Sequence, residues 1–369
     1  MRPASPIPSW RSKGFPPPFD KNVLSCSASV QDEIIASFDF YAEIRELGKE
    51  LLRTNHHTNP AKSFTRFQAY IRQAKTFYET AAVLHHRASP LNYYYSFMNI
   101  AKALVLLRTP NFVDRNLKHG ISPNSKSASL RRQRVIAKGA GVFPIFYEAA
   151  TGKTLSNKSS LKIVDLLGYV TDVTYEYSVL KYGTHASFRT KLALSIDSDA
   201  KTGFPLLAVF NSHTKGFKLI EKRVTKSFDE VNIPQHHLRS IFELPAELAS
   251  QYRYFEGKKF AFTTTLPINT LFKDIADLVH TNPFNDDYLF SLNCPIRTPK
   301  LTPMNEMLAI YIVMFFLGSL VRYRPDLLEA MLSTKDAWII ERFTKSAPLT
   351  FLRHARNMLD GKYLVYALR

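Results

Sequence analysis

The 369-residue sequence is short of cysteine, with only Cys26 and Cys294. Two cysteines cannot form the disulfide framework of a small secreted protein, and this content fits a reducing compartment. Acidic residues are also scarce, because 31 Asp and Glu stand against 49 Lys and Arg, a formal net charge of +18. Such an excess favours polyanionic partners, above all nucleic acid, and less often an anionic membrane face. We therefore expect a basic, cytoplasmic protein.

A long hydrophobic run is missing as well. The most membrane-like stretch, 307–321, is uncharged, but it is shorter than the roughly 20 residues that a spanning helix needs. The N-terminus has no apolar run after its basic residues that would mark a secretory signal. Hydrophobic residues still make up 45% of the chain, enough for a sizeable core. We expect the stretch to be a buried core helix and predict no membrane span.

Most common motifs of enzymes and metal sites do not occur. The (D/E)xK pattern of metal-dependent nucleases is present at Asp199–Lys201 and Glu256–Lys258, but so short a pattern arises often by chance in a lysine-rich chain. There is no GxGxxG, HExxH, paired CxxC or GxSxG pattern, so dinucleotide, zinc and serine-hydrolase sites have no support. The stretch 150–154 ends like a phosphate-binding loop, but Tyr147 stands where that loop requires glycine. Three pairs of adjacent histidines lack the three- or four-residue spacing of a helical metal site. We therefore predict no cofactor and no metal.

Apolar residues at three- and four-residue steps predict helices in the first part of the chain, at 30–53, 64–87 and 91–108. The third is apolar nearly all round and should lie inside a bundle, with Ser89 as its N-cap. A short helix is expected at 161–170. Thr302 as N-cap and Pro303 as first residue should begin the long apolar helix. Two further helices are expected at 326–331 and 334–360.

The middle of the chain has β-branched and aromatic segments bounded by turn residues, which is typical of strands. Strands are expected at 192–196, 205–210, 217–221 and 259–265, and a hairpin at 134–147 around residues 138–139. The fold class is thus a mainly α helical bundle with a β-containing middle segment, α+β overall. We divide the chain into a proline-rich extended arm (1–29), the first part of the bundle (30–110), a basic loop-rich excursion (111–163), the β-containing middle (164–281) and the second part of the bundle with its long buried helix (282–369).

The segment 111–163 concentrates the positive charge. It holds ten Lys and Arg but only two acidic residues, a net +8 of the total +18. We expect its cations to lie on one exposed face and to contact the phosphates of DNA or RNA. The candidate residues are Lys126, Arg131, Arg132, Arg134 and Lys138. The alternative is a solvated loop that binds nothing.

Three separated stretches together resemble a known family. The stretch 89–104 (SPLNYYYSFMNIAKAL) is an aromatic helix, His119-Gly120-Ile121 is a His-Gly-apolar step, and 314–325 (MFFLGSLVRYRP) is an apolar helix that ends in Arg-Tyr-x-Pro. In this order they resemble the motifs of YaaC-like bacterial proteins, over residues 64–120 and 303–356. The resemblance implies a fold more than a function. The chain departs from it in its proline arm and its long basic segment.

The paired-helix core also resembles, distantly, the HEPN group of helical RNA-acting and defence proteins. The Arg/His motif of that group is not met, because Arg115 and His119 are one residue too close. At four residues apart on a helix they would still share a face. A degenerate, metal-independent RNase that uses His119 with Arg322 or Arg115 is therefore one functional alternative.

Polar residues embedded in the apolar motif helices predict a pocket. If Arg322 faces His119 across the bundle, with Asn99 and Lys102 nearby, buried polar groups converge as they do in functional sites. Tyr323 and Arg324 belong to the same candidate pocket; the alternative is that these cations only cap a helix.

The leading function is nucleic-acid association, in phage defence or stress. The alternatives are the RNase and a non-catalytic module, in which the proline arm and the basic segment bind a protein partner or a second copy. Whether the protein is an enzyme stays open.

Overall fold

A computed structural model of the chain shows a mainly α protein with small antiparallel sheets, as the fold class predicted. It describes residues 21–26, 29–110, 112, 118–124, 127–155, 158–183, 187–196, 202–210, 225, 228–232, 252–256, 262–263, 279–281, 289–293, 304–361 and 363–368. Two compact units are present. One contains Ala186–Ile296 with Met1–Val23 and Val365–Ala367, and the other contains Leu24–His185 and Arg297–Leu364 with Leu368–Arg369. Most of the predicted arm lies outside the described residues.

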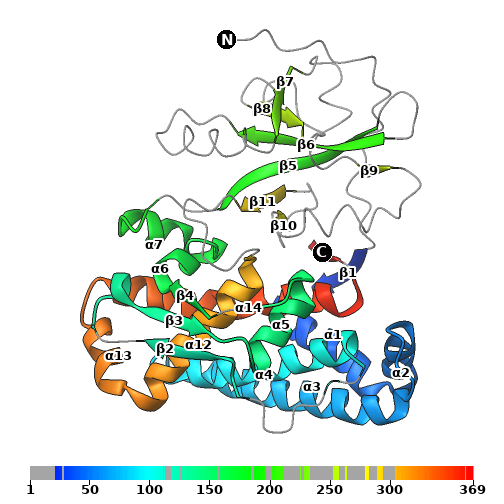
Figure 1. Cartoon of the computed structure of the whole chain (residues 1–369), viewed down its shortest axis with the longest axis horizontal. Coiled ribbons are helices and arrows are strands. Elements are labelled where there is room, and N and C mark those ends of the chain that lie inside the picture. The colour runs from blue at the N-terminus through cyan, green and yellow to red at the C-terminus, as the bar shows by residue number, and fades with distance from the viewer. Residues whose placement is uncertain are drawn as a thin grey trace. The chain divides into compact units, whose positions relative to one another are not determined.

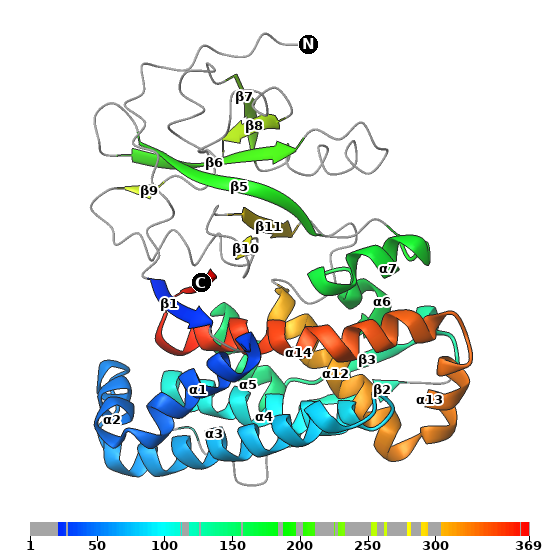
Figure 2. The same ribbon diagram turned by 180° about the vertical axis from the view of Figure 1, so that it is seen from behind.

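The second unit begins with four helices, which are α1 (Val30–Glu43), α2 (Arg45–Thr54), α3 (Pro60–Val83) and α4 (Ser89–Arg108). The prediction of a single helix over 30–53 was wrong. Ile44 has an extended backbone (φ −87°, ψ 98°) and separates α1 from α2. Helix α3 starts where Asn59 accepts a hydrogen bond from the Lys62 amide at 3.1 Å. Helix α4 lies along α3 (Figures 1 and 2) and is buried nearly all round, as predicted; Ser89 is its first residue rather than its cap.

Three C-terminal helices complete the bundle, namely α12 (Glu306–Tyr323), α13 (Pro325–Leu332) and α14 (Asp336–Asp360). The N-cap of α12 is Asn305, which accepts from the Leu308 amide at 2.9 Å, so the predicted cap at Thr302 was wrong. Among the described helices, α12 is apolar and long enough to cross a membrane, but 83% of it is buried in the protein. It packs against α4 and α14. This fits the expected core helix.

A three-stranded antiparallel sheet lies in the basic segment. Its order is β2 (Ile121–Asn124), β3 (Arg134–Ala137) and β4 (Ser159–Lys162), and the turn η1 (Leu130–Arg132) precedes β3. The predicted hairpin at 134–147 was wrong, because only β3 is a strand and α5 (Val142–Thr151) follows it. Then come α6 (Ile163–Leu167), η2 (Thr171–Val173) and α7 (Thr174–Val179). The sheet lies on one side of the helices and α14 on the other (Figures 1 and 2).

The first unit contains a seven-stranded antiparallel sheet. Its strands are β5 (Ser187–Ile196), β6 (Thr202–Phe210), β7 (Asp229–Val231), β8 (Tyr252–Glu256), β9 (Phe262–Thr263), β10 (Val279–Thr281) and β11 (Leu289–Asn293). The order is β10-β11-β5-β6-β8-β7, and β9 pairs with β6. Two predicted strands, 192–196 and 205–210, are confirmed within β5 and β6. The prediction at 217–221 lies outside the described residues. Separately, β1 (Lys21–Cys26) pairs with β12 (Tyr363–Leu368).

Candidate functional site

His119 is held in a tight turn of the basic segment, just before β2. The amides of Val142 and Phe143, at the start of α5, donate to the carbonyls of residue 118 and His119 at 2.9 and 3.0 Å. Gly120 (φ +78°) and Gly141 (φ +127°) make this approach possible, because a Cβ on Gly141 would lie 2.5 Å from the Gly120 Cα. The turn therefore caps α5 with backbone carbonyls and fixes the position of the imidazole.

The imidazole of His119 pairs with a buried phenol on α4. The Tyr94 hydroxyl lies 2.6 Å from His119 Nδ1, and the ring of Phe315 packs against both side chains, with centroids 5.1 and 5.8 Å away. Burial, with the neighbouring Tyr311 phenol, raises the pKa of Tyr94 well above its ordinary value, so it stays protonated. His119 Nε2 makes no hydrogen bond to a described residue. When Nε2 carries the ring hydrogen it can donate a hydrogen bond to an anion, and when Nδ1 carries it Nε2 can accept a proton.

Two cations lie within electrostatic range of His119. Burial lowers the pKa of His119, and the positive charges of Arg322 and Lys102 lower it further. The imidazole is therefore neutral at physiological pH. The ammonium group of Lys102 lies 5.7 Å from the centroid of the Tyr70 ring on α3. The positive charges of Arg322 and Lys102 thus both act on His119.

The other residues of the candidate pocket have different environments. Asn99 is buried and donates to the Tyr95 carbonyl at 2.9 Å within α4. Arg324 forms an ion pair with Asp326 at 3.1 Å on the surface. Tyr323 is 64% exposed, beside Arg322. Arg115 lies outside the described residues.

The outer face of the three-stranded sheet in the basic segment is half-buried and carries positive charge. Burial alternates along β3 and β4, so Val135 and Leu161 face the core while Arg134 and Lys162 face outward. Arg134 is directly opposite Lys162 in the register of the two strands, and its guanidinium donates to the Ser160 hydroxyl at 3.3 Å. Two like charges in this relation destabilise a sheet.

The remaining cations of the segment differ in what they contact. Arg132 and Lys138 are exposed at the two ends of β3. The guanidinium of Arg131 donates to the carbonyls of Leu180 and Lys181 at 3.2 and 2.7 Å. These two residues directly follow α7, so Arg131 caps the C-terminal end of that helix. Lys126 lies outside the described residues. Eight of the ten cations are described, and none of these pairs with a carboxylate of the described part.

A buried carboxylate on α12 is a feature that the sequence analysis missed. Glu306 is fully buried and accepts from the Thr171 amide and hydroxyl at 2.6 and 2.7 Å and from His354 Nε2 at 2.9 Å. Burial and the charge of Glu306 raise the pKa of nearby Asp172, which accepts from the Thr350 hydroxyl at 2.7 Å. The only signal in the sequence is a glutamate at the start of an apolar helix. Its satisfied bonds indicate a structural role.

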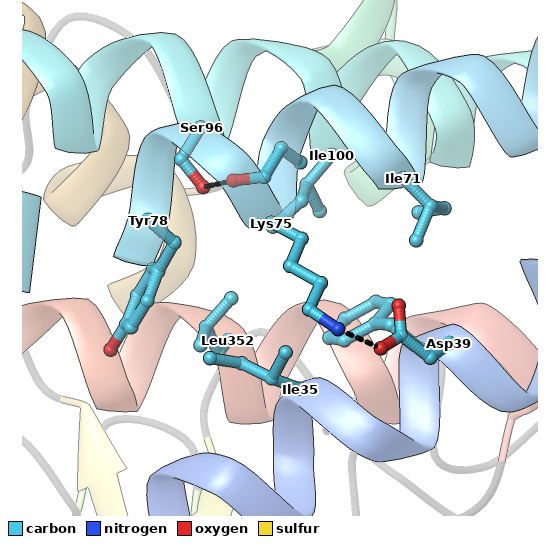
Figure 3. Close-up of a pocket in the computed structure, with 10 residues that line it drawn as sticks. Ile35, Asp39, Ile71, Lys75, Tyr78, Ser96, Ile100 and Leu352 are labelled. Atoms are coloured by element: carbon cyan, nitrogen blue, oxygen red, sulfur yellow. Dashed lines mark hydrogen bonds and ion pairs between the residues drawn. The ribbon is translucent and has the colours of Figure 1, made fainter. Parts of the chain in front are cut away.

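A cavity among the helices is too small to bind a ligand. A cavity of about 20 Å³ lies between α1, α3, α4 and α14, with the ion pair of Lys75 and Asp39 at its rim (Figure 3). That is room for about one water molecule. No group of three His, Cys, Asp or Glu in the described part could hold a metal ion.

Comparison with known proteins supports the family resemblance. A family model described as YaaC-like Protein matches residues 42–359, which is most of the chain. No curated protein and no solved structure is similar to it. None of these comparisons supports the resemblance to the HEPN group.

Proposed function

The chain belongs to the YaaC-like protein family, and we propose that it binds nucleic acid through the outer face of the β2–β3–β4 sheet. The observation that carries this proposal is the pair of Arg134 and Lys162, side by side on adjacent strands with no described carboxylate between them. Such a pair costs stability in the free protein and gains it when a phosphate lies between the charges. Arg132 and Lys138 extend the same positive potential to the ends of β3.

Filter binding over a salt series tests this proposal. Affinity for DNA or RNA should fall steeply with salt, and the double variant Arg134→Gln/Lys162→Gln should reduce the slope of log affinity against log salt by about 2. The matched control is Lys62→Gln/Lys335→Gln, which removes the same charge at exposed sites on α3 and before α14. Affinity that ignores salt, or no binding at low salt, would refute the proposal and leave the protein-binding module as the alternative.

A second candidate function, metal-independent cleavage of RNA, is favoured by the site around His119. Its Nε2 lacks a described partner, and Arg322 and Lys102 supply positive charge nearby. In this reaction Nε2 takes the proton of a ribose 2′-hydroxyl, whose oxygen bonds to the adjacent phosphorus. The bond from phosphorus to the 5′-oxygen breaks, and that oxygen takes a proton from water. The two cations stabilise the charge that develops on the phosphate.

Cleavage of a labelled RNA in the presence of a chelator tests this second function. His119→Ala should abolish cleavage, and His85→Ala, an exposed histidine of the loop before α4, should not change it. Cleavage that persists in His119→Ala would exclude this site. A role in phage defence or stress is the proposed setting, and survival of phage infection by cells with and without the protein tests it.

A further inference from the structure

Tyr323 differs from the other exposed aromatic side chains of the described part. Phe40, Tyr175 and Trp338 each contact another ring, at centroid distances of 5.5 or 5.7 Å. Tyr323 is 64% exposed and has no ring contact with a described residue; instead the guanidinium of Arg322 lies 5.1 Å from its centroid. A large ring with an open face beside an arginine is a surface on which another flat group can stack.

Arg322 is held in place and is not neutralised. Its guanidinium donates to the Tyr95 hydroxyl, and the Tyr95 ring stacks on Phe77 at 5.3 Å with an interplanar angle of 30°. No described carboxylate pairs with Arg322. The acidic residues of the following helix, Asp326 and Glu329, pair with other arginines at 3.1 and 3.0 Å. The hydrogen bond to Tyr95 on α4 therefore orients the guanidinium of Arg322, and no described carboxylate neutralises its charge.

We propose that Tyr323 and Arg322 form a stacking platform for an unpaired nucleobase, so that this end of the bundle takes single-stranded nucleic acid. Unpaired bases stack on tyrosine rings and guanidinium planes, whereas the bases of a duplex hide these faces. This inference rests on the proposed nucleic-acid binding and names the form of nucleic acid that is bound.

Fluorescence anisotropy with three probes tests the platform in the full-length protein. The probes are a uridine oligomer, an abasic oligomer with the same number of phosphates, and a duplex of the same length. The protein should bind the uridine oligomer at least about fivefold more tightly than the abasic one, which is the lower end of what stacking of one base contributes. Tyr323→Ala should remove this difference, and Tyr323→Phe should retain it. The matched control is Tyr175→Ala, an exposed tyrosine on α7.

The outcomes separate this inference from the proposed function. Equal, salt-dependent affinity for the uridine and abasic oligomers would overturn the platform and leave electrostatic binding in place. A base preference that survives Tyr323→Ala would also overturn it. Binding of the duplex alone at low salt would overturn the platform and leave the proposed function in place, whereas binding of none of the three probes would overturn both. Circular dichroism of each variant shows whether it is folded, and since Tyr323 is a surface residue we expect unchanged spectra.

Discussion

Replacing Gly141 with alanine should destabilise the second unit, which contains the helices, far more than the same change at Gly152. The two glycines flank one helix, α5, as its N-cap and its C-cap. At Gly141 the backbone (φ 127°, ψ −171°) is one that other residues avoid, and a Cβ would lie 2.5 to 2.6 Å from three backbone atoms. The chain has to move apart there, which breaks the hydrogen bonds of Val142 and Phe143 to the His119 turn. We expect a loss of about 2–6 kcal/mol.

At Gly152 only the conformational cost remains. Its φ is +70°, but nothing lies within 4 Å of the position of a Cβ. Alanine should therefore cost about 1–2 kcal/mol there. Urea unfolding followed by far-UV circular dichroism measures both variants, and a shift in midpoint at constant slope reports stability. Equal losses in the two variants, or a larger loss at Gly152, would refute the reasoning that the turn of His119 depends on this close approach.

Three further predictions concern the core and two titrating groups. Phe351→Ala should lower the free energy of unfolding, measured in urea, by about 3–5 kcal/mol, because this fully buried ring stacks on Phe97 at 3.9 Å. A loss no larger than that of a surface substitution would contradict this prediction. The pKa of His119 lies below its ordinary 6.5, so the unfolded chain binds the proton first and stability falls as the pH drops below 6.5. His119→Gln should flatten part of this decrease, and His86→Gln, whose group has a lowered pKa as well, should flatten a separate part; unchanged pH profiles of the urea midpoint would count against both. Burial and a neighbouring carboxylate raise the pKa of Asp172, which penalises its charged form in the folded state. Asp172→Asn should thus maintain or raise stability at neutral pH, with the advantage lost on acidification; a marked loss at neutral pH would show that the charge is needed.

The helices could be predicted where the signal is local. The apolar stripes of α3, α4, α12 and α14 repeat at helical spacing, and each lies where the sequence placed it to within a few residues. The stretch 142–151 misled because a short, continuously apolar segment fits a strand as well as a buried helix. Ile44 misled for another reason, because the apolar stripe continues across the break and only packing against α3 decides where the helix ends.

The candidate site could be predicted in part. Motif order pointed to His119 and Arg322, and the positive charge of Arg322 acts on His119, as does that of Lys102. The hydrogen bond between Tyr94 and His119 was not predicted. A tyrosine on an apolar helix gives no sign that it contacts a histidine 25 residues further along the chain. The charge of the basic segment also could not show that the guanidinium of Arg131 donates hydrogen bonds to backbone carbonyls. That contact joins residues about 50 positions apart in the sequence.

The partners of α4 have a consequence for synthesis on the ribosome. Helix α4 ends at Arg108, yet α12, which packs against it, begins only at Glu306, after all strands of the seven-stranded sheet have been translated. At about 5–20 residues per second, roughly 10–40 s pass between the two events. During that time the face of α4 that packs against α12 and α14 is exposed in the nascent chain. We expect the N-terminal helices to need protection by a chaperone until the C-terminal third emerges.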